Sequence, residues 1–192
     1  MKFRNWVYMT VKNKKLNNST FLQSIIVDSN IIQYSADKNR SKSTAYFDLF
    51  ASLKDQSNEL AISEITIAEN LHALYGKKYV KAYNHISQFV KIIVAENVLL
   101  LAAKIGGLYY EEGFRDIEIC DKIIAATAIL EKGLILTRNH KHFPPPFFES
   151  IQWIQVQYKI NGTYFHTDDV CLYKPRYELI IRRINEKNNS DE

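Results

Sequence analysis

The sequence predicts an α/β fold with three layers, in which helices cover both faces of a mainly parallel sheet of four to five strands. Short apolar runs of strand length alternate with longer stretches of helical periodicity, which is the pattern of βα units in a parallel sheet. The 192 residues are 46% hydrophobic and 12% aromatic, which suffices for the packed core of one domain with additions. Because the pattern changes after residue 143, a C-terminal β-hairpin and a short helix are expected to follow the α/β part.

The apolar pattern gives the elements of the α/β part in order. Its strands are apolar runs too short for helices, over residues 25–28, 60–63, 91–95 and 134–137. Its helices have apolar positions three and four residues apart, over 43–53, 66–75, 78–89, 97–112 and 117–132. Ser43 would cap the first helix, and Gly76 and Gly113 would end two others. Gly133 stands just beyond the last helix, where a left-handed backbone is tolerated.

The C-terminal part begins at three consecutive prolines, residues 144–146, which cannot continue a helix or a central strand. Strands over 151–160 and 163–167 flank Asn161-Gly162, a strong two-residue hairpin signal. A helix over 177–186 is expected next, with a frayed end over 187–192. The predicted division is therefore an N-terminal extension over 1–22, the α/β domain over 23–158 and a C-terminal extension over 159–192.

Charge and cysteine content limit the classes of function. The net charge is +4, and residues 1–18 hold five basic residues, no acid and three aromatic residues. That mixture can bind phosphates and stack bases, although a solvated arm or an added strand is the favoured interpretation. The two cysteines have no disulfide or zinc spacing, so a reduced, cytoplasmic setting is expected. No apolar run reaches the roughly 18 residues of a membrane span.

Three carboxylates occupy positions where strands end or helices begin. Asp28 ends the first apolar run, Glu69 follows the second strand, and Asp121 lies in the first turn of the helix over 117–132. Binding groups gather beyond the carboxyl ends of parallel strands. Two carboxylates about 4 Å apart repel by roughly 4 kcal/mol at an effective dielectric constant near 20. If the fold brings the three together, they need protons or a hard cation, and Mg²⁺ or Mn²⁺ fits oxygen ligands.

Each carboxylate also has a structural explanation when it is taken alone. Asp28 could form a local turn with the two polar residues that follow it. Thr66 and Glu69 have the spacing of a capping box, and on spacing alone that explanation is favoured. Glu64 competes with Glu69 for any functional role. A negative charge at Asp121 is already favourable in the first turn of a helix.

Four segments, taken in order, resemble the PIN-domain nucleases, especially toxins of the VapC type. They are Val27-Asp28-Ser29-Asn30, Ile62-Ser63-x-Ile65-Thr66-x-Ala68-Glu69, Asp121-x-x-Ile124-Ala125-Ala126-Thr127-Ala128 and Leu136-Thr137-Arg138-Asn139-x-x-x-Phe143. The resemblance covers about residues 24–157. It implies a metal-dependent endoribonuclease whose catalytic and metal-binding residues are Asp28, Glu69 and Asp121, with Mg²⁺ or Mn²⁺ as cofactor. It also implies the toxin of a type II toxin–antitoxin pair, with RNA as substrate, a small antitoxin as partner, and a homodimer.

The chain departs from this family where many members place a fourth acid. Asn139 and His142 stand at those positions, so the expected site holds one ion firmly and a second only with the substrate phosphate. Asp116 is a weaker candidate for a compensating acid. Weaker roles are expected for polar and basic residues near the carboxylates. Ser29, Asn30 and Asn139 would orient water or phosphate, and Arg138 and Lys122 would steady backbone charge.

Two other functions remain open from the sequence. The missing fourth acid and the appended segments suit a PIN scaffold that binds RNA or protein with weak or no cleavage. A phosphoacceptor domain also places an Asp at a strand end, but the acidic pair and late Lys that such domains use are not found. The RNA target is not predicted, because loops and groove shape would set it.

Overall fold

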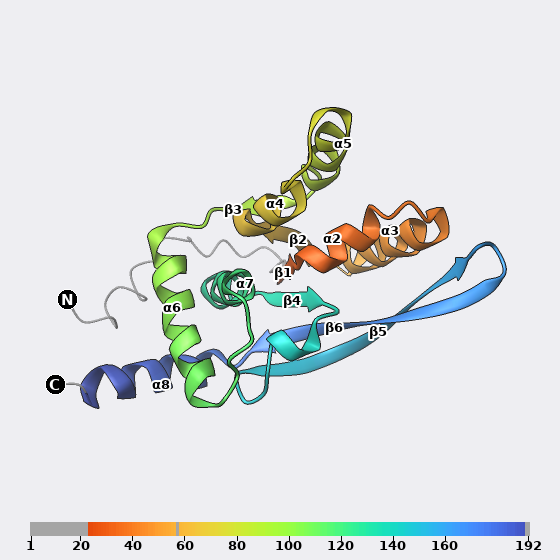
Figure 1. The fold of residues 1–192 in the computed structure, drawn as a ribbon. Helices are drawn as coiled ribbons and strands as arrows, with labels where there is room; N and C mark the ends of the chain where they lie inside the picture. Colours follow the sequence, from red (N-terminus) through yellow and green to blue (C-terminus); the bar gives the residue numbers. More distant parts are fainter. Residues whose placement is uncertain (1–22, 57, 191–192) are drawn as a thin grey trace.

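The computed structural model describes residues 23–56 and 58–190 (Figure 1). The predicted extension over 1–22 lies outside these residues. The strands are β1 (Gln23–Val27), β2 (Asn58–Ser63), β3 (Val90–Ile92), β4 (Leu134–Thr137), β5 (Phe148–Ile160) and β6 (Tyr164–Pro175). The helices are α2 (Ser29–Ser35), α3 (Arg40–Asp55), α4 (Glu64–Leu71), α5 (Gly76–Ile86), α6 (Glu96–Glu111), α7 (Ile119–Glu131) and α8 (Tyr177–Ser190), with a short 3₁₀ helix η1 (His140–His142).

All six described strands form one sheet in the order β3-β2-β1-β4-β6-β5. The first four run parallel, with Ile25 paired to Leu60 on β2 and to Leu134 on β4. The predicted mainly parallel sheet of an α/β fold is therefore confirmed. β6 runs antiparallel to β4, with Leu136 opposite Leu172, and β5 completes the hairpin at the edge of the sheet. The sheet thus continues without a break across the predicted boundary between residues 158 and 159.

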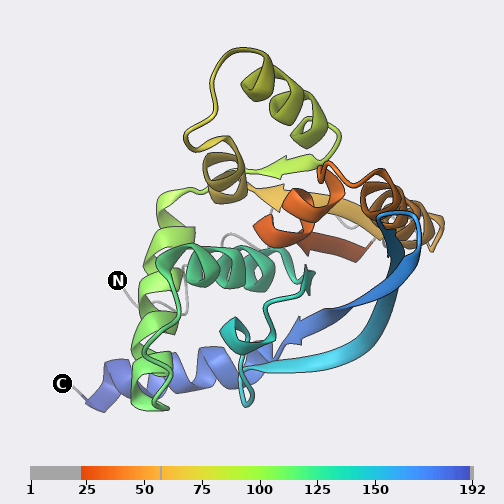
Figure 2. The same ribbon diagram turned by 45° about the vertical axis from the view of Figure 1, so that its right-hand side comes forward.

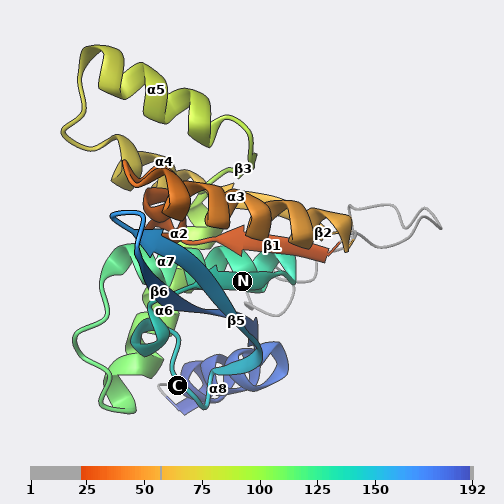
Figure 3. The same ribbon diagram turned by 90° about the vertical axis from the view of Figure 1, so that its right-hand side faces the viewer.

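The sheet has a separate apolar core on each face, because side chains alternate along a strand. On β1, Ile26 joins the core under α6 and α7, whereas Ile25 and Val27 join the core under α2 and α3. Figure 3 shows α3 running alongside β1 and β2, with α5 standing away from the sheet. These cores give the three predicted layers. They hold the carboxyl edge, the end of the sheet where β1, β2 and β4 finish, in a fixed arrangement.

Two helix starts differ from the prediction. α3 begins three residues before Ser43, because Asn39 accepts hydrogen bonds from the backbone N–H groups of Ser41 and Lys42 and so caps the helix. α2 was not predicted at all. It is only seven residues long and begins directly after Asp28, which is too short for helical periodicity to stand out.

One predicted helix end and the role predicted for one glycine are also wrong. The helix expected over 66–75 ends at Leu71, and Gly76 begins α5 instead of stopping α4. After α7 the left-handed residue is Lys132, with φ 52°. Gly133 is required for a different reason, because a Cβ there would lie 2.7 Å from the carbonyl oxygen of Ser24 on β1. Close contact between helix end and strand, rather than a left-handed backbone, explains this glycine.

The predicted hairpin is confirmed and is longer than expected. Asn161 and Gly162 both have positive φ, 52° and 76°, as a tight hairpin turn requires. Figure 2 shows the hairpin curving back toward α3, and buried Val156 and Val170 join the same core as α3. The end predicted to fray is helical as far as Ser190. Within the described residues, no helix has the length and apolar character needed to cross a membrane.

Candidate active site

Asp28 lies at the carboxyl edge, directly after β1, and forms the N-cap of α2. Its side chain is only 3% exposed. Thr137, the last residue of β4, donates a 2.6 Å hydrogen bond from its hydroxyl to Asp28 Oδ2. The side-chain amide of Asn30 donates to the same oxygen and, at 3.1 Å, to Thr137 Oγ1. Two neighbouring strands and a helix start therefore fix this carboxylate from three directions.

Glu69 faces Asp28 from α4. The alternative explanation of Glu69 as part of a capping box is wrong, because α4 begins at Glu64 with Ser63 as its N-cap. The hydroxyl of Thr66 is buried without a hydrogen-bond partner. Ser29, the first residue of α2, donates a hydrogen bond to Glu69 Oε2. Glu64 is engaged elsewhere, since its carboxylate accepts a 3.0 Å hydrogen bond from the backbone N–H of Val94.

Asp121 reaches the same place from the first turn of α7 and is 9% exposed. Its Oδ2 lies 2.6 Å from Nδ1 of His142 in η1. The same Nδ1 is 2.7 Å from the side-chain amide of Asn139. The two residues at the positions where a fourth acid was expected therefore form a polar bridge to Asp121.

The three carboxylates are close enough to perturb one another. Burial raises the pKa of Asp28 from 3.8 to about 6; the hydrogen bond from Thr137 lowers it, and the negative charges of Asp121 and Glu69 raise it further. Burial also raises the pKa of Asp121, which His142 lowers and Glu69 raises. Burial and then Glu69 raise the pKa of the Cys120 thiol to about 11. Asp28, Glu69 and Asp121 thus lie near enough for their charges to act on one another, and their role as catalytic and metal-binding residues stays a prediction.

The oxygen donors gathered here fit a hard divalent cation by their chemistry. The pKa of the Asp28 carboxyl is raised by burial and then by two neighbouring carboxylates, so its charged form lacks compensating positive charge. Across residues 23–56 and 58–190, no group of three or more His, Cys, Asp or Glu side chains has the spacing to hold a metal ion as the side chains now stand. Ser29 and His142 each contact one oxygen of these carboxylates, Oε2 of Glu69 and Oδ2 of Asp121 respectively.

Some of the residues with weaker predicted roles contact the site, and others do not. Ser29, Asn30 and Asn139 all contact the site through the hydrogen bonds described above. Arg138 contributes through its backbone, whose N–H donates a 3.2 Å hydrogen bond to Asn30 Oδ1, while its guanidinium pairs with Asp168 on β6 at 2.8 Å. Lys122, on α7, has its side chain beside Gly106 of α6. Asp116 is exposed in the segment before α7.

Sequence reasoning assigned no role to two residues. Thr137 is fully buried and bonds directly to Asp28; as a polar residue that ends an apolar run, it carried the same signal as Asp28 itself. Asp168 is buried on β6, one residue beyond the strand predicted over 163–167.

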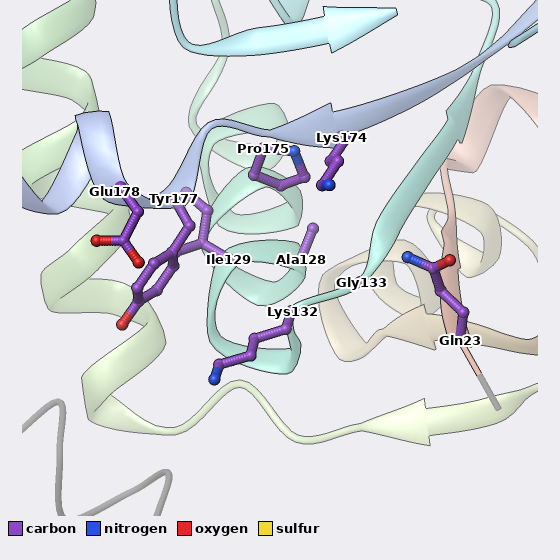
Figure 4. A pocket seen from close by; sticks show the side chains of 9 residues that line it. All are labelled: Gln23, Ala128, Ile129, Lys132, Gly133, Lys174, Pro175, Tyr177 and Glu178. Atoms are coloured by element: carbon purple, nitrogen blue, oxygen red, sulfur yellow. The ribbon is translucent and has the colours of Figure 1, made fainter. Parts of the chain in front are cut away.

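A hollow of about 250 Å³ opens at the opposite end of the sheet (Figure 4). It is lined by Gln23, which begins β1, by Gly133 before β4 and by Pro175, which ends β6. These positions mark the amino ends of the parallel strands. The hollow is therefore remote from the carboxyl edge that carries the acidic residues.

The parallel sheet, its helices on both faces and the acidic residues at its carboxyl edge define a PIN-type nuclease fold, the class implied by the sequence resemblance. No protein-family model matches the chain. Ribonuclease VapC19 from two strains of Mycobacterium tuberculosis is 33% identical over 99 residues, which are 50% of this chain and 76% of the relative. The chain belongs to the VapC family of ribonucleases.

A solved structure agrees on the fold. The structure of VapBC2 from Rickettsia felis, which is bound to a DNA fragment from the VapBC2 promoter, superimposes on this chain with a TM-score of 0.52 at 23% identity. That likeness covers 62% of this chain and 90% of the other. FitAcB from Neisseria gonorrhoeae gives a TM-score of 0.49 at 24% identity, over 62% of this chain and 91% of the other.

Proposed function

We propose that this protein is a divalent-metal-dependent endoribonuclease that hydrolyses RNA phosphodiester bonds and acts as the toxin of a type II toxin–antitoxin pair. The observation that carries the proposal is the buried carboxylate of Asp28, fixed by Thr137 and Asn30 and facing Glu69 and Asp121. Membership of the VapC ribonuclease family supports the reaction class.

Asp28, Asp121 and Glu69 would hold Mg²⁺ or Mn²⁺, which supplies Lewis-acid activation of water and charge neutralisation at phosphorus. Thr137 and Asn30 keep the carboxylate of Asp28 in one orientation. Ser29 contacts Glu69 and His142 contacts Asp121. These contacts would set how readily the two carboxylates turn toward an ion. The polar side chain of Asn139 beside His142 is available to a substrate phosphate or to water.

Cleavage assays on carboxylate variants test the proposal. Purified protein with structured RNA and Mg²⁺ should cut the RNA, and EDTA should stop it. Asp121→Asn and Glu69→Gln should each lower the cleavage rate by about 10- to 100-fold or more, because removal of groups that hold or orient a metal ligand has at least this effect. Glu64→Gln is the matched control on the same helix as Glu69 and should cleave normally.

The alternative, a PIN scaffold that binds RNA without cutting it, is favoured if the wild type retains RNA but shows neither cleavage nor Mn²⁺ binding by calorimetry. The hydrogen bonds that Ser29 and His142 make to Glu69 and Asp121 are the observation in its favour. Cleavage that survives all the carboxylate substitutions would contradict the site assignment itself.

The toxin role further requires a small antitoxin partner and, as in the sequence-based expectation, a homodimer. Apolar and aromatic side chains on the outer helices offer surface for such contacts; Tyr79, Val80 and Tyr83 of α5 and Leu99 and Leu100 of α6 are exposed. Light scattering on the purified chain measures its oligomeric state. Growth arrest on expression, relieved by co-expression of a neighbouring small gene, tests the toxin role.

A further inference from the structure

The β5–β6 hairpin carries a buried carboxylate of its own. Asp168 lies on β6 opposite Val156 of β5 and is 1% exposed. The phenol of Tyr46 on α3 donates a 2.9 Å hydrogen bond to its Oδ2, and the guanidinium of Arg138 lies 2.8 Å from its Oδ1. His166, on the same strand, is 3.3 Å from Oδ1.

Fold stability is a weak explanation for this acid. Val156 and Val170, its neighbours across and along the hairpin, are buried in the core that includes α3, so Asp168 and its polar partners interrupt an otherwise apolar environment. Replacing a buried ion pair by apolar residues of similar volume is often neutral or stabilising. We therefore look for the role of Asp168 in the side chain that it binds.

Asp168 holds the side chain of Arg138, the first residue after β4. The guanidinium carbon of Arg138 lies 4.3 Å from the ring centre of Tyr34 on α2, and this ring stacks on Tyr46. An ion pair on one side and an aromatic face on another leave the guanidinium little freedom. The loop after β4 is thereby tied to both the hairpin and α2.

The backbone of Arg138 continues this connection into the acidic site. Its N–H donates to Asn30 Oδ1 at 3.2 Å. The amide group of Asn30 donates in turn to Asp28 and to Thr137. A continuous series of contacts therefore runs from Asp168 on the hairpin to the carboxylate of Asp28 at the carboxyl edge.

We propose that Asp168 is a positioning residue of the nuclease site: by anchoring Arg138 it fixes Asn30 around Asp28, and the β5–β6 hairpin is thus a functional part of the site. This inference rests on the proposed ribonuclease activity. It gives Arg138 an anchoring role in place of the direct contact with substrate phosphate expected from the sequence.

The kinetic test compares Asp168→Asn with Asp169→Asn, the same chemical change at the next, exposed position of β6. Asp168→Asn should lower kcat for RNA cleavage by about 10- to 100-fold, the effect of removing a partner that orients a metal ligand. KM should change little, because Asp168 does not contact the substrate. Asp169→Asn should match the wild type. Unchanged kcat in a folded Asp168→Asn variant overturns the proposal.

A spectroscopic test does not depend on catalysis. The side-chain amide ¹⁵N–¹H signals of Asn30, identified by their loss in Asn30→Ala, should shift or broaden in Asp168→Asn and stay in place in Asp169→Asn. Unmoved Asn30 signals would contradict the connection even if the wild type fails to cleave RNA. Failed cleavage by the wild type, in contrast, would contradict the proposed function only. The Asn30 signals would still test the connection between Asp168 and the site.

The single variant Arg138→Lys covers the case in which Asp168→Asn folds poorly, and a double-mutant cycle tests the coupling where both variants fold. Arg138→Lys keeps the positive charge but loses the fork that pairs with a carboxylate, so it should reproduce the fall in kcat. The double variant should be no slower than the slower single variant, because both changes break one connection. Additive losses of kcat would show that the two residues act separately and would overturn the proposal.

Discussion

Replacing Asp28 by Asn should stabilise the metal-free protein at pH 8 while it abolishes RNA cleavage. Asp28 is 3% exposed, and its pKa in the folded protein is about 6, against an ordinary 3.8. The folded state therefore resists ionisation of this carboxyl group more than the unfolded chain does. At pH 8 the group is ionised in both states, and the folded state carries the whole penalty of a buried charge beside two other carboxylates.

The size of the effect follows from the pKa difference. One pKa unit corresponds to 1.36 kcal/mol, so a rise of about two units implies that ionisation of Asp28 destabilises the fold by roughly 3 kcal/mol at pH 8. Asn is neutral and has nearly the same shape, so Asp28→Asn should recover most of this. Weaker hydrogen bonds to Thr137 and Asn30 reduce the net gain to about 1–3 kcal/mol.

The sign of the pH dependence makes the test specific. A raised pKa adds stability that is fully present below about pH 4 and lost as the pH rises through about 6. Urea unfolding in EDTA should therefore show the variant more stable than the wild type at pH 8 and nearly equal to it at pH 4. A variant that is less stable at pH 8, or a difference that does not change with pH, would refute the reasoning.

Three further outcomes are expected. Gly133→Ala should destabilise the protein by about 1–3 kcal/mol in urea unfolding, because its Cβ would meet a backbone carbonyl; Gly107→Ala on α6, where the added Cβ meets nothing within 4 Å, is the control and should stabilise by up to about 1 kcal/mol. Asn39→Ala should cost about 1 kcal/mol by removing the cap of α3, and a loss below about 0.3 kcal/mol would contradict that role. His142→Ala should move the acid limb of the cleavage pH profile upward, since His142 lowers the pKa of Asp121; a downward shift would contradict the contact.

The parallel part of the fold could be predicted because each of its strands is a short, nearly continuous apolar run. Such runs are typical of strands buried on both faces, and those predicted over 25–28, 60–63 and 134–137 correspond to β1, β2 and β4. The errors lie where tertiary contacts decide a local choice. α2 has only two turns of its own, and the cap of α3 depends on which of several polar residues reaches the helix start.

Glu69 shows how a local pattern can point to the wrong contact. The spacing from Thr66 to Glu69 satisfies a capping box, yet α4 begins two residues before Thr66, directly after the last residue of β2. Once the helix starts there, Glu69 lies in its second turn, where the backbone N–H groups are already used and its carboxylate turns to Ser29 of α2. The position of the strand end, rather than the capping pattern, decides what this acid does.

The hairpin shows the opposite limit of sequence reasoning. Its turn was predictable because Asn161 and Gly162 tolerate positive φ, but nothing in the alternation of β6 distinguishes Asp168 from a solvent-facing acid. Its importance arises only when the sheet brings β6 beside β4, so that this acid meets Arg138. A site built on the residues that resemble the family would therefore be incomplete in this chain. The expectation that follows is concrete: substitutions that leave Asp28, Glu69 and Asp121 intact but detach the hairpin from Arg138 should still slow the reaction.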